Sequence, residues 1–166
     1  MAELTGQPAP IFTLPDQNGD MVNIVDFKGK NVILYFYPKD MTPGCTTEAC
    51  DFRDQYSEFS TLDTVILGIS PDPAARHQKF IEKHTLPFTL LADEEQAAAE
   101  LYGVWTLKKN FGKEYMGIER STFLINKEGI VAKEWRKVRV KGHMEETLQA
   151  VKELNEGTLN SFHTQS

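Results

Sequence analysis

Two cysteines, Cys45 and Cys50, lie five residues apart in one short segment of this 166-residue chain. The segment follows the apolar run 32–37, which predicts a buried strand, and Pro43 and Gly44 precede Cys45 at the predicted start of a helix. The first backbone N–H groups of a helix have no partner within it, so a thiolate at this position is stabilised. A second thiol on the same helix can react with the oxidised form of the first. The pair therefore indicates redox chemistry.

Other residue types around Cys45 suit a reactive thiolate. Thr42 offers a hydroxyl that can cap the helix or bind a small oxygen-bearing substrate. Pro38 and Pro43 stand on either side of the loop and stiffen it, and Gly44 lets the backbone approach a ligand closely. A cysteine pair on a helix is more often two small buried apolar side chains, and a lone threonine is most simply a helix cap. The Pro-Gly step before Cys45 favours the functional interpretation.

Length and composition restrict the class of protein. We expect a single domain over residues 4–155, followed by a polar tail at 156–166. The net charge of −6 is spread along the chain, which argues against nucleic acid and anionic membranes as partners. The sequence has neither a membrane-spanning apolar run nor a basic-then-apolar N-terminus, so we expect a cytoplasmic protein. Two cysteines in such a chain are more often catalytic or incidental than structural.

Strand and helix patterns alternate around the cysteine segment. The Asn-Gly step at 18–19 predicts an N-terminal hairpin, and the strand–helix alternation predicts parallel strands followed by an antiparallel hairpin. The sequence therefore predicts an α/β, thioredoxin-like fold, with a mixed central sheet, helices on both faces and an N-terminal β-hairpin. The loop after strand 32–37 would lie at the carboxyl edge of the sheet, where open α/β folds place their sites. The expected strands are 11–14, 22–24, 32–37, 63–70, 88–91, 121–125 and 130–135; the expected helices are 43–59, 73–84, 93–101 and 142–155; segment 103–117 is expected to be rich in loops.

The four histidines of the chain share no short metal-ligand spacing, so we expect neither a metal nor another cofactor. His77 and His84 lie seven residues apart on the helix that starts at Pro73, with Asp72 as its expected N-cap. We expect both of these histidines to face solvent.

The pattern Pro38-x-x-x-Thr42-x-x-Cys45 resembles the active-site signature of peroxiredoxins. The longer string 37–50 resembles that of their Q-type branch, the bacterioferritin comigratory proteins. Segment 9–14 is similar to the opening of that family, and segment 120–125 is similar to its distal arginine strand. The resemblance covers residues from about 4 to 155.

The resemblance implies a thiol-specific peroxidase that reduces hydrogen peroxide and organic hydroperoxides to water and alcohols. Cys45 would be the peroxidatic cysteine that becomes a sulfenic acid, and Cys50 would resolve it as an intramolecular disulfide. Thr42 and the amides of Gly44 and Cys45 would bind the peroxide. Arg120 would stabilise the thiolate and the transition state, as a permanently charged planar group can.

The resemblance also assigns an acidic position and partners. Glu48 would orient the arginine rather than react. Thioredoxin would be the reductant, with glutaredoxin left open, and the protein would be a monomer, with a dimer left open.

The five-residue spacing itself makes a structural prediction. On an unbroken helix the two cysteine Cα atoms would lie about 8–9 Å apart, beyond the limit of roughly 7 Å for a disulfide. A Cys45–Cys50 bond therefore requires the first turns of the helix to unwind.

Three other functions use the same residues. A dithiol–disulfide oxidoreductase normally has two residues between its cysteines, and this chain has four. A cysteine hydrolase needs a histidine base, and no sequence signature brings one to Cys45. A redox-sensing protein remains possible alongside catalysis.

Overall fold

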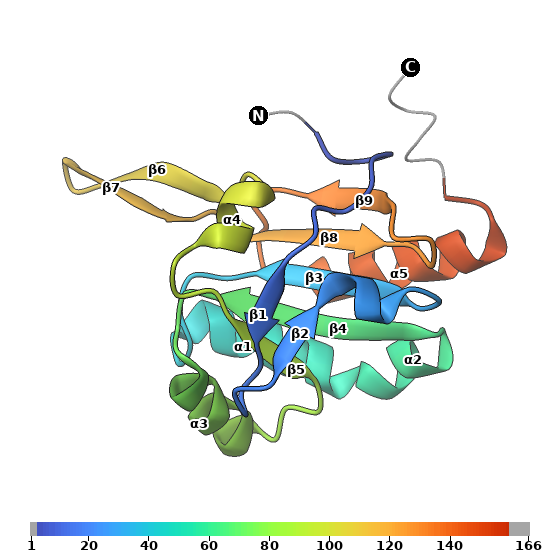
Figure 1. Ribbon diagram of the computed structural model, residues 1–166, viewed down its shortest axis with the longest axis horizontal. Coiled ribbons are helices and arrows are strands. Elements are labelled where there is room, and N and C mark those ends of the chain that lie inside the picture. The colour runs from blue at the N-terminus through green and yellow to red at the C-terminus, as the bar shows by residue number, and fades with distance from the viewer. Residues whose placement is uncertain (1–2, 160–166) are drawn as a thin grey trace.

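The computed structural model describes residues 3–159, which form a central five-stranded sheet in the order β5-β4-β3-β8-β9 (Figure 1). β3 pairs in parallel with β4, and β4 with β5, whereas β8 runs antiparallel to both β3 and β9. The mixed sheet of the sequence prediction is thereby confirmed. The strands are β1 (Thr13–Pro15), β2 (Met21–Asn23), β3 (Asn31–Phe36), β4 (Thr64–Ser70), β5 (Thr89–Ala92), β6 (Trp105–Asn110), β7 (Lys113–Ile118), β8 (Ser121–Ile125) and β9 (Val131–Trp135); the helices are α1 (Pro43–Asp54), α2 (Tyr56–Thr61), α3 (Ala74–His84), α4 (Ala97–Leu101) and α5 (His143–Glu156), with a 3-10 helix at Ile24–Phe27.

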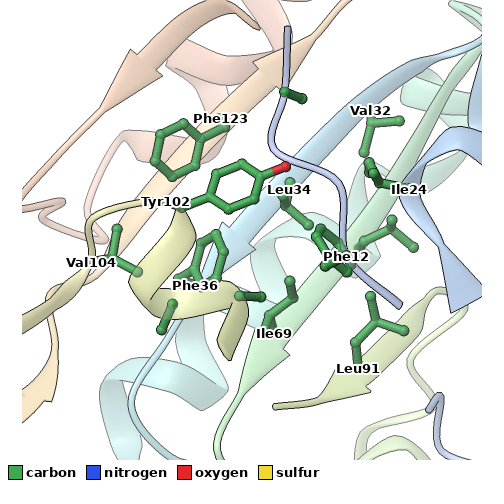
Figure 2. Close-up of a cluster of buried hydrophobic side chains, with 14 of the residues drawn as sticks. Phe12, Ile24, Val32, Leu34, Phe36, Ile69, Leu91, Tyr102, Val104 and Phe123 are labelled. Atoms are coloured by element: carbon green, nitrogen blue, oxygen red, sulfur yellow. The ribbon is translucent and has the colours of Figure 1, made fainter. Parts of the chain in front are cut away.

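Both faces of the sheet are covered, as expected for this fold class. β3 is buried along its whole length, and its side chains alternate between two apolar clusters. One cluster lies under the β1–β2 hairpin and α4; Figure 2 shows Tyr102 packed there beside Phe36 and Phe123. The other cluster packs against α1, α2, α3 and α5 and contains Cys45. Because β3 is buried throughout and ends at Phe36, the loop that leads to α1 starts from a firmly held position.

The N-terminal hairpin is confirmed, with Gly19 at a positive φ of 84° in its turn. The expected single helix over 43–59 is wrong, because the helix is interrupted at Gln55, which joins α1 to α2. Phe52 of α1 and Phe59 of α2 both belong to the same buried apolar cluster, with their ring centroids 6.0 Å apart. α1 remains unbroken through both cysteines.

Segment 103–117 is not a loop but mostly the antiparallel hairpin β6–β7, which projects from the sheet (Figure 1). The strands turn at Phe111 and Gly112, both at positive φ. Most residues of the hairpin are exposed or half-buried, so the apolar alternation that marks a half-buried strand is weak in the sequence. The prediction failed for that reason.

Helix starts differ from expectation at two places. α3 has Pro73 as its N-cap residue, rather than Asp72 as N-cap and proline as first helical residue. Helix 93–101 is reduced to α4, and Asp93 accepts hydrogen bonds from the backbone of Ala98 and Ala99. Among residues 3–159, no helix is both long and apolar enough to cross a membrane. The predicted tail extends into residues 160–166, which lie outside the described part of the chain.

Candidate active site

Cys45 lies in the first turn of α1, at the carboxyl end of β3. Its side chain is buried, whereas Pro43 and Gly44 at the start of the helix are exposed. Thr42 occupies the N-cap position, as expected, but its hydroxyl donates to the backbone carbonyl of Lys39 at 2.8 Å instead of capping the helix. The Thr42 oxygen thus keeps its acceptor capacity. The site therefore presents a thiol just below an exposed backbone turn.

Arg120 is brought to this turn by the sheet. It immediately precedes β8, and Ser121 at the start of β8 pairs with Phe36 at the end of β3. Arg120 Nη2 lies 3.3 Å from Cys45 Sγ, and Nη1 donates to Glu48 Oε1 at 2.6 Å. One planar guanidinium therefore joins the thiol to a carboxylate, which fits the geometry of this side chain.

Glu48 is nearly fully buried one turn beyond the start of α1. Burial raises the pKa of Glu48 to about 7, even though the positive charge of Arg120 opposes the increase. Its second carboxylate oxygen, Oε2, is buried without a hydrogen-bond partner. Burial lowers the pKa of Arg120, but Glu48 and Cys45 outweigh that effect and raise it overall, so the guanidinium is charged.

The β6–β7 hairpin adds a second cation near this site. Burial and the charge of Arg120 lower the pKa of Lys108, on β6, while the charges of Glu119 and Cys45 oppose that shift. Lys108 was not predicted as a site residue, since the hairpin that carries it was not predicted either.

Cys50 lies on the same continuous helix as Cys45, and its side chain is half-buried. Both thiols are free. This arrangement agrees with the expectation that an intact α1 keeps the two sulfur atoms apart.

The loop that precedes Thr42 is held by a polar network that sequence reasoning missed. His77 is fully buried, so its predicted solvent exposure is wrong. Its ring contacts the Asp40 carboxylate at 2.6 Å and the carbonyl of Leu91 at 2.9 Å. The available signal was the position of His77 three residues before the buried Phe80, on the apolar face of α3. Half-buried Pro38 begins this loop.

Asp40, Asp72 and His77 are close enough together to be considered as metal ligands. Their ligand atoms are already engaged, however: Asp72 Oδ2 accepts from Asp40 N and Ser70 Oγ, and His77 Nδ1 faces Asp40 Oδ2. These hydrogen bonds account for the cluster without an ion. The absence of a metal stays a prediction.

A buried thiol at a helix start, paired with a guanidinium on a thioredoxin-like domain, defines a thiol-dependent redox enzyme. The family model "AhpC/TSA family" matches residues 5–134. Peroxiredoxin Bcp of Bacillus subtilis is 62% identical over 151 residues, which cover 91% of this chain and 96% of that protein. Peroxiredoxin Bcp of Escherichia coli is 44% identical over 148 residues, covering 89% and 95%. A solved structure of Xanthomonas campestris peroxiredoxin Q is 40% identical with a TM-score of 0.83, covering 87% of this chain and 91% of that one.

The chain therefore belongs to the AhpC/TSA family and, within it, to the peroxiredoxins of the Bcp or Q type. It is a thiol peroxidase of the thioredoxin-dependent class, and the enzyme class predicted from the sequence is confirmed.

Proposed function

We propose that Cys45 is the peroxidatic cysteine of this enzyme. Its thiolate attacks one oxygen of the peroxide, an S–O bond forms as the O–O bond breaks, and the second oxygen leaves as water or an alcohol after taking up a proton. Cys45 becomes a sulfenic acid. The observation that carries this assignment is the 3.3 Å contact between Cys45 Sγ and Arg120 Nη2, because a guanidinium beside the sulfur favours the thiolate.

Four groups would support the attack. Arg120 stabilises the negative charge on sulfur and then on the breaking O–O bond. Thr42 accepts a hydrogen bond from the peroxide, because its own proton is directed at Lys39. The amides of Gly44 and Cys45 belong to the first helical turn, where N–H groups can donate to the peroxide oxygens.

Three further residues would support the loop and the cation rather than react. Pro38 and Pro43 restrict the loop at its two ends. Glu48 orients the guanidinium through its 2.6 Å ion pair with Arg120.

Cys50 would act as the resolving cysteine. Its thiolate attacks the sulfenic sulfur of Cys45, a disulfide forms, and the sulfenic oxygen leaves as water after protonation. The first turns of α1 must unwind for this step. Thioredoxin, in preference to glutaredoxin, then reduces the disulfide by thiol–disulfide exchange and returns both thiols.

Substrate range and organisation follow from the same reasoning. One solved relative, the Xanthomonas campestris bacterioferritin comigratory protein, is described by its alkyl peroxide reduction activity. The exposed rim above Cys45 supports hydrogen peroxide and organic hydroperoxides as substrates of this chain. We further propose a single domain over residues 4–155 that acts as a cytoplasmic monomer.

A thioredoxin-coupled assay of peroxide consumption tests these roles. Cys45→Ser should abolish turnover, because serine supplies no thiolate. Intact-mass analysis after one equivalent of peroxide should show loss of two hydrogens in the wild type, with peptide mapping placing the bond between Cys45 and Cys50. Wild-type activity in Cys45→Ser would overturn the assignment.

A further inference from the structure

Asp40 lies in the loop after β3, two residues before Thr42, and both oxygens of its buried carboxylate have partners. Tyr37 Oη donates to Asp40 Oδ1 at 2.5 Å. His77 Nδ1, on α3, lies 2.6 Å from Asp40 Oδ2, and both side chains are fully buried. The carboxylate therefore connects the end of β3 to α3.

The backbone of Asp40 is held as well. Its N–H donates to Asp72 Oδ2 at 2.7 Å, and its carbonyl accepts from Arg76 Nη2 at 3.4 Å. Thr42 is tied to the neighbouring residue, Lys39, by the 2.8 Å hydrogen bond from its hydroxyl. Any displacement of Asp40 therefore displaces the carbonyl that orients the Thr42 hydroxyl.

The hydrogen-bond partners of His77 show how this contact is made. A carbonyl oxygen only accepts, so His77 Nε2, 2.9 Å from the carbonyl of Leu91, carries a hydrogen. His77 Nδ1 faces a carboxylate oxygen, and such a contact is attractive only when one proton lies between the two atoms. The pair therefore shares one proton, carried either by the imidazole or by the carboxyl group, and is electrically neutral as a whole.

We propose that the Asp40–His77 pair is a positioning device for the peroxidase reaction. It fixes the loop so that the Thr42 hydroxyl and the first turn of α1 hold the peroxide in line with Cys45 Sγ. The inference rests on the proposed roles of Cys45 and Thr42. Since neither Asp40 nor His77 is placed against the sulfur, the pair acts on how the peroxide is held and not on the reactivity of the thiol itself.

The test separates these two effects by reacting Cys45 with two electrophiles. All variants are made in the full chain with Cys50→Ser, so that Cys45 is the only thiol. The rates of reaction with hydrogen peroxide and with iodoacetamide are measured on the reduced protein. Iodoacetamide reports the thiolate without using the peroxide-binding groups. Asp40→Ala should slow the peroxide reaction by about 10- to 100-fold, as expected for a misplaced reactant, and leave alkylation unchanged.

Asp40→Asn is the conservative variant. Its amide oxygen can accept from Tyr37 and its N–H can donate to His77 Nδ1, with His77 neutral, so every hydrogen bond is kept without the shared proton. The peroxide rate should return close to that of the parent. Glu134→Gln is the matched control, because Glu134 binds the backbone of Leu4 and Thr5 from β9 in another part-buried network. It should lower the melting temperature without changing the ratio of the two rates.

Three results would overturn the proposal: an unchanged peroxide rate in Asp40→Ala, an equal loss of both rates, or an Asp40→Asn variant as slow as the alanine variant. If Asp40→Ala does not fold, His77→Leu and its conservative counterpart His77→Asn give the same comparison with the same expected results. Failure of the proposed function is distinguishable, because the parent protein itself would then not react with peroxide at Cys45.

Discussion

Glu48 and Arg120 form an ion pair with an N···O distance of 2.6 Å, in which the carboxylate is nearly fully buried and one of its oxygens has no hydrogen-bond partner. The same guanidinium donates to Cys45 Sγ. The Arg120 guanidinium therefore contacts the Cys45 thiol and the Glu48 carboxylate together. The buried, ionisable Glu48 is thus a part of the candidate active site.

Glu48→Gln should change how stability depends on pH. Burial raises the folded-state pKa of Glu48 to about 7, above the ordinary 4.5, so between these values the folded protein binds this proton more tightly than the unfolded chain does. The contribution of Glu48 to the free energy of unfolding is thus full below pH 4.5 and is lost as the pH rises to 7. The free energy of the wild type minus that of Glu48→Gln should fall by about 1–3 kcal/mol from pH 5 to pH 7.5 in urea titrations of the reduced protein. A difference that increases with pH would contradict the raised pKa.

Arg120→Lys should lower kcat/KM for hydrogen peroxide by about 100-fold. Lysine keeps the positive charge, but a single ammonium cannot reproduce the fork that contacts Cys45 and Glu48 together. Arg136→Lys is the control, because Arg136, which directly follows β9, makes a comparable ion pair with Glu134. Equal losses in the two variants would mean that the effect arises from general destabilisation.

Gly44→Ala should separate activity from stability. A Cβ at Gly44 would lie 3.3 Å from Arg120 Nη2, close enough to push the guanidinium away from the sulfur. The peroxide rate should fall by about 10-fold, whereas the melting temperature should stay the same or rise, because alanine is the better helix former. Gly68→Ala should instead lower the melting temperature and leave the peroxide rate unchanged, since its Cβ would lie 2.7 Å from Leu90 in the core. An unchanged peroxide rate in Gly44→Ala would show that the Arg120 contact tolerates displacement.

Oxidation should unwind α1. One equivalent of peroxide should reduce the helical circular dichroism signal, and the backbone amides of α1 after Pro43 should exchange hydrogen faster while those of α5 do not. Cys50→Ser should show neither change, because the sulfenic acid at Cys45 then has no resolving thiol and α1 need not unwind. A Cys45–Cys50 disulfide with undiminished helix content would contradict the helix argument.

The sequence predicts the chemistry best where the pattern is local. Pro43, Gly44 and Cys45 mark a helix start within a few residues, and the structure places them there. Arg120 could be connected to Cys45 only through the family resemblance, because their contact depends on the pairing of β3 with β8.

The burial of Asp40 could not be predicted from local patterns, whereas the spacing of His77 and Phe80 on one face of α3 was a local signal for the burial of His77. A charged loop residue is expected to face solvent, and only the packing of the loop between β3 and α1 against α3 buries Asp40. The β6–β7 hairpin was missed for a related reason, since its strands bury too little surface to impose alternation on the sequence.

The antiparallel pairing of β8 with β3 brings together Cys45 and Arg120, which lie 75 positions apart in the chain. A nascent polypeptide that ends before Arg120 already contains both cysteines but lacks the guanidinium, and β3 lacks one of its neighbouring strands. On the proposed role of Arg120, we expect Cys45 of such an unfinished chain to react slowly with peroxide. Sensitivity to peroxide would then arise once the chain has been extended past β8, and an unfinished molecule would be spared premature oxidation.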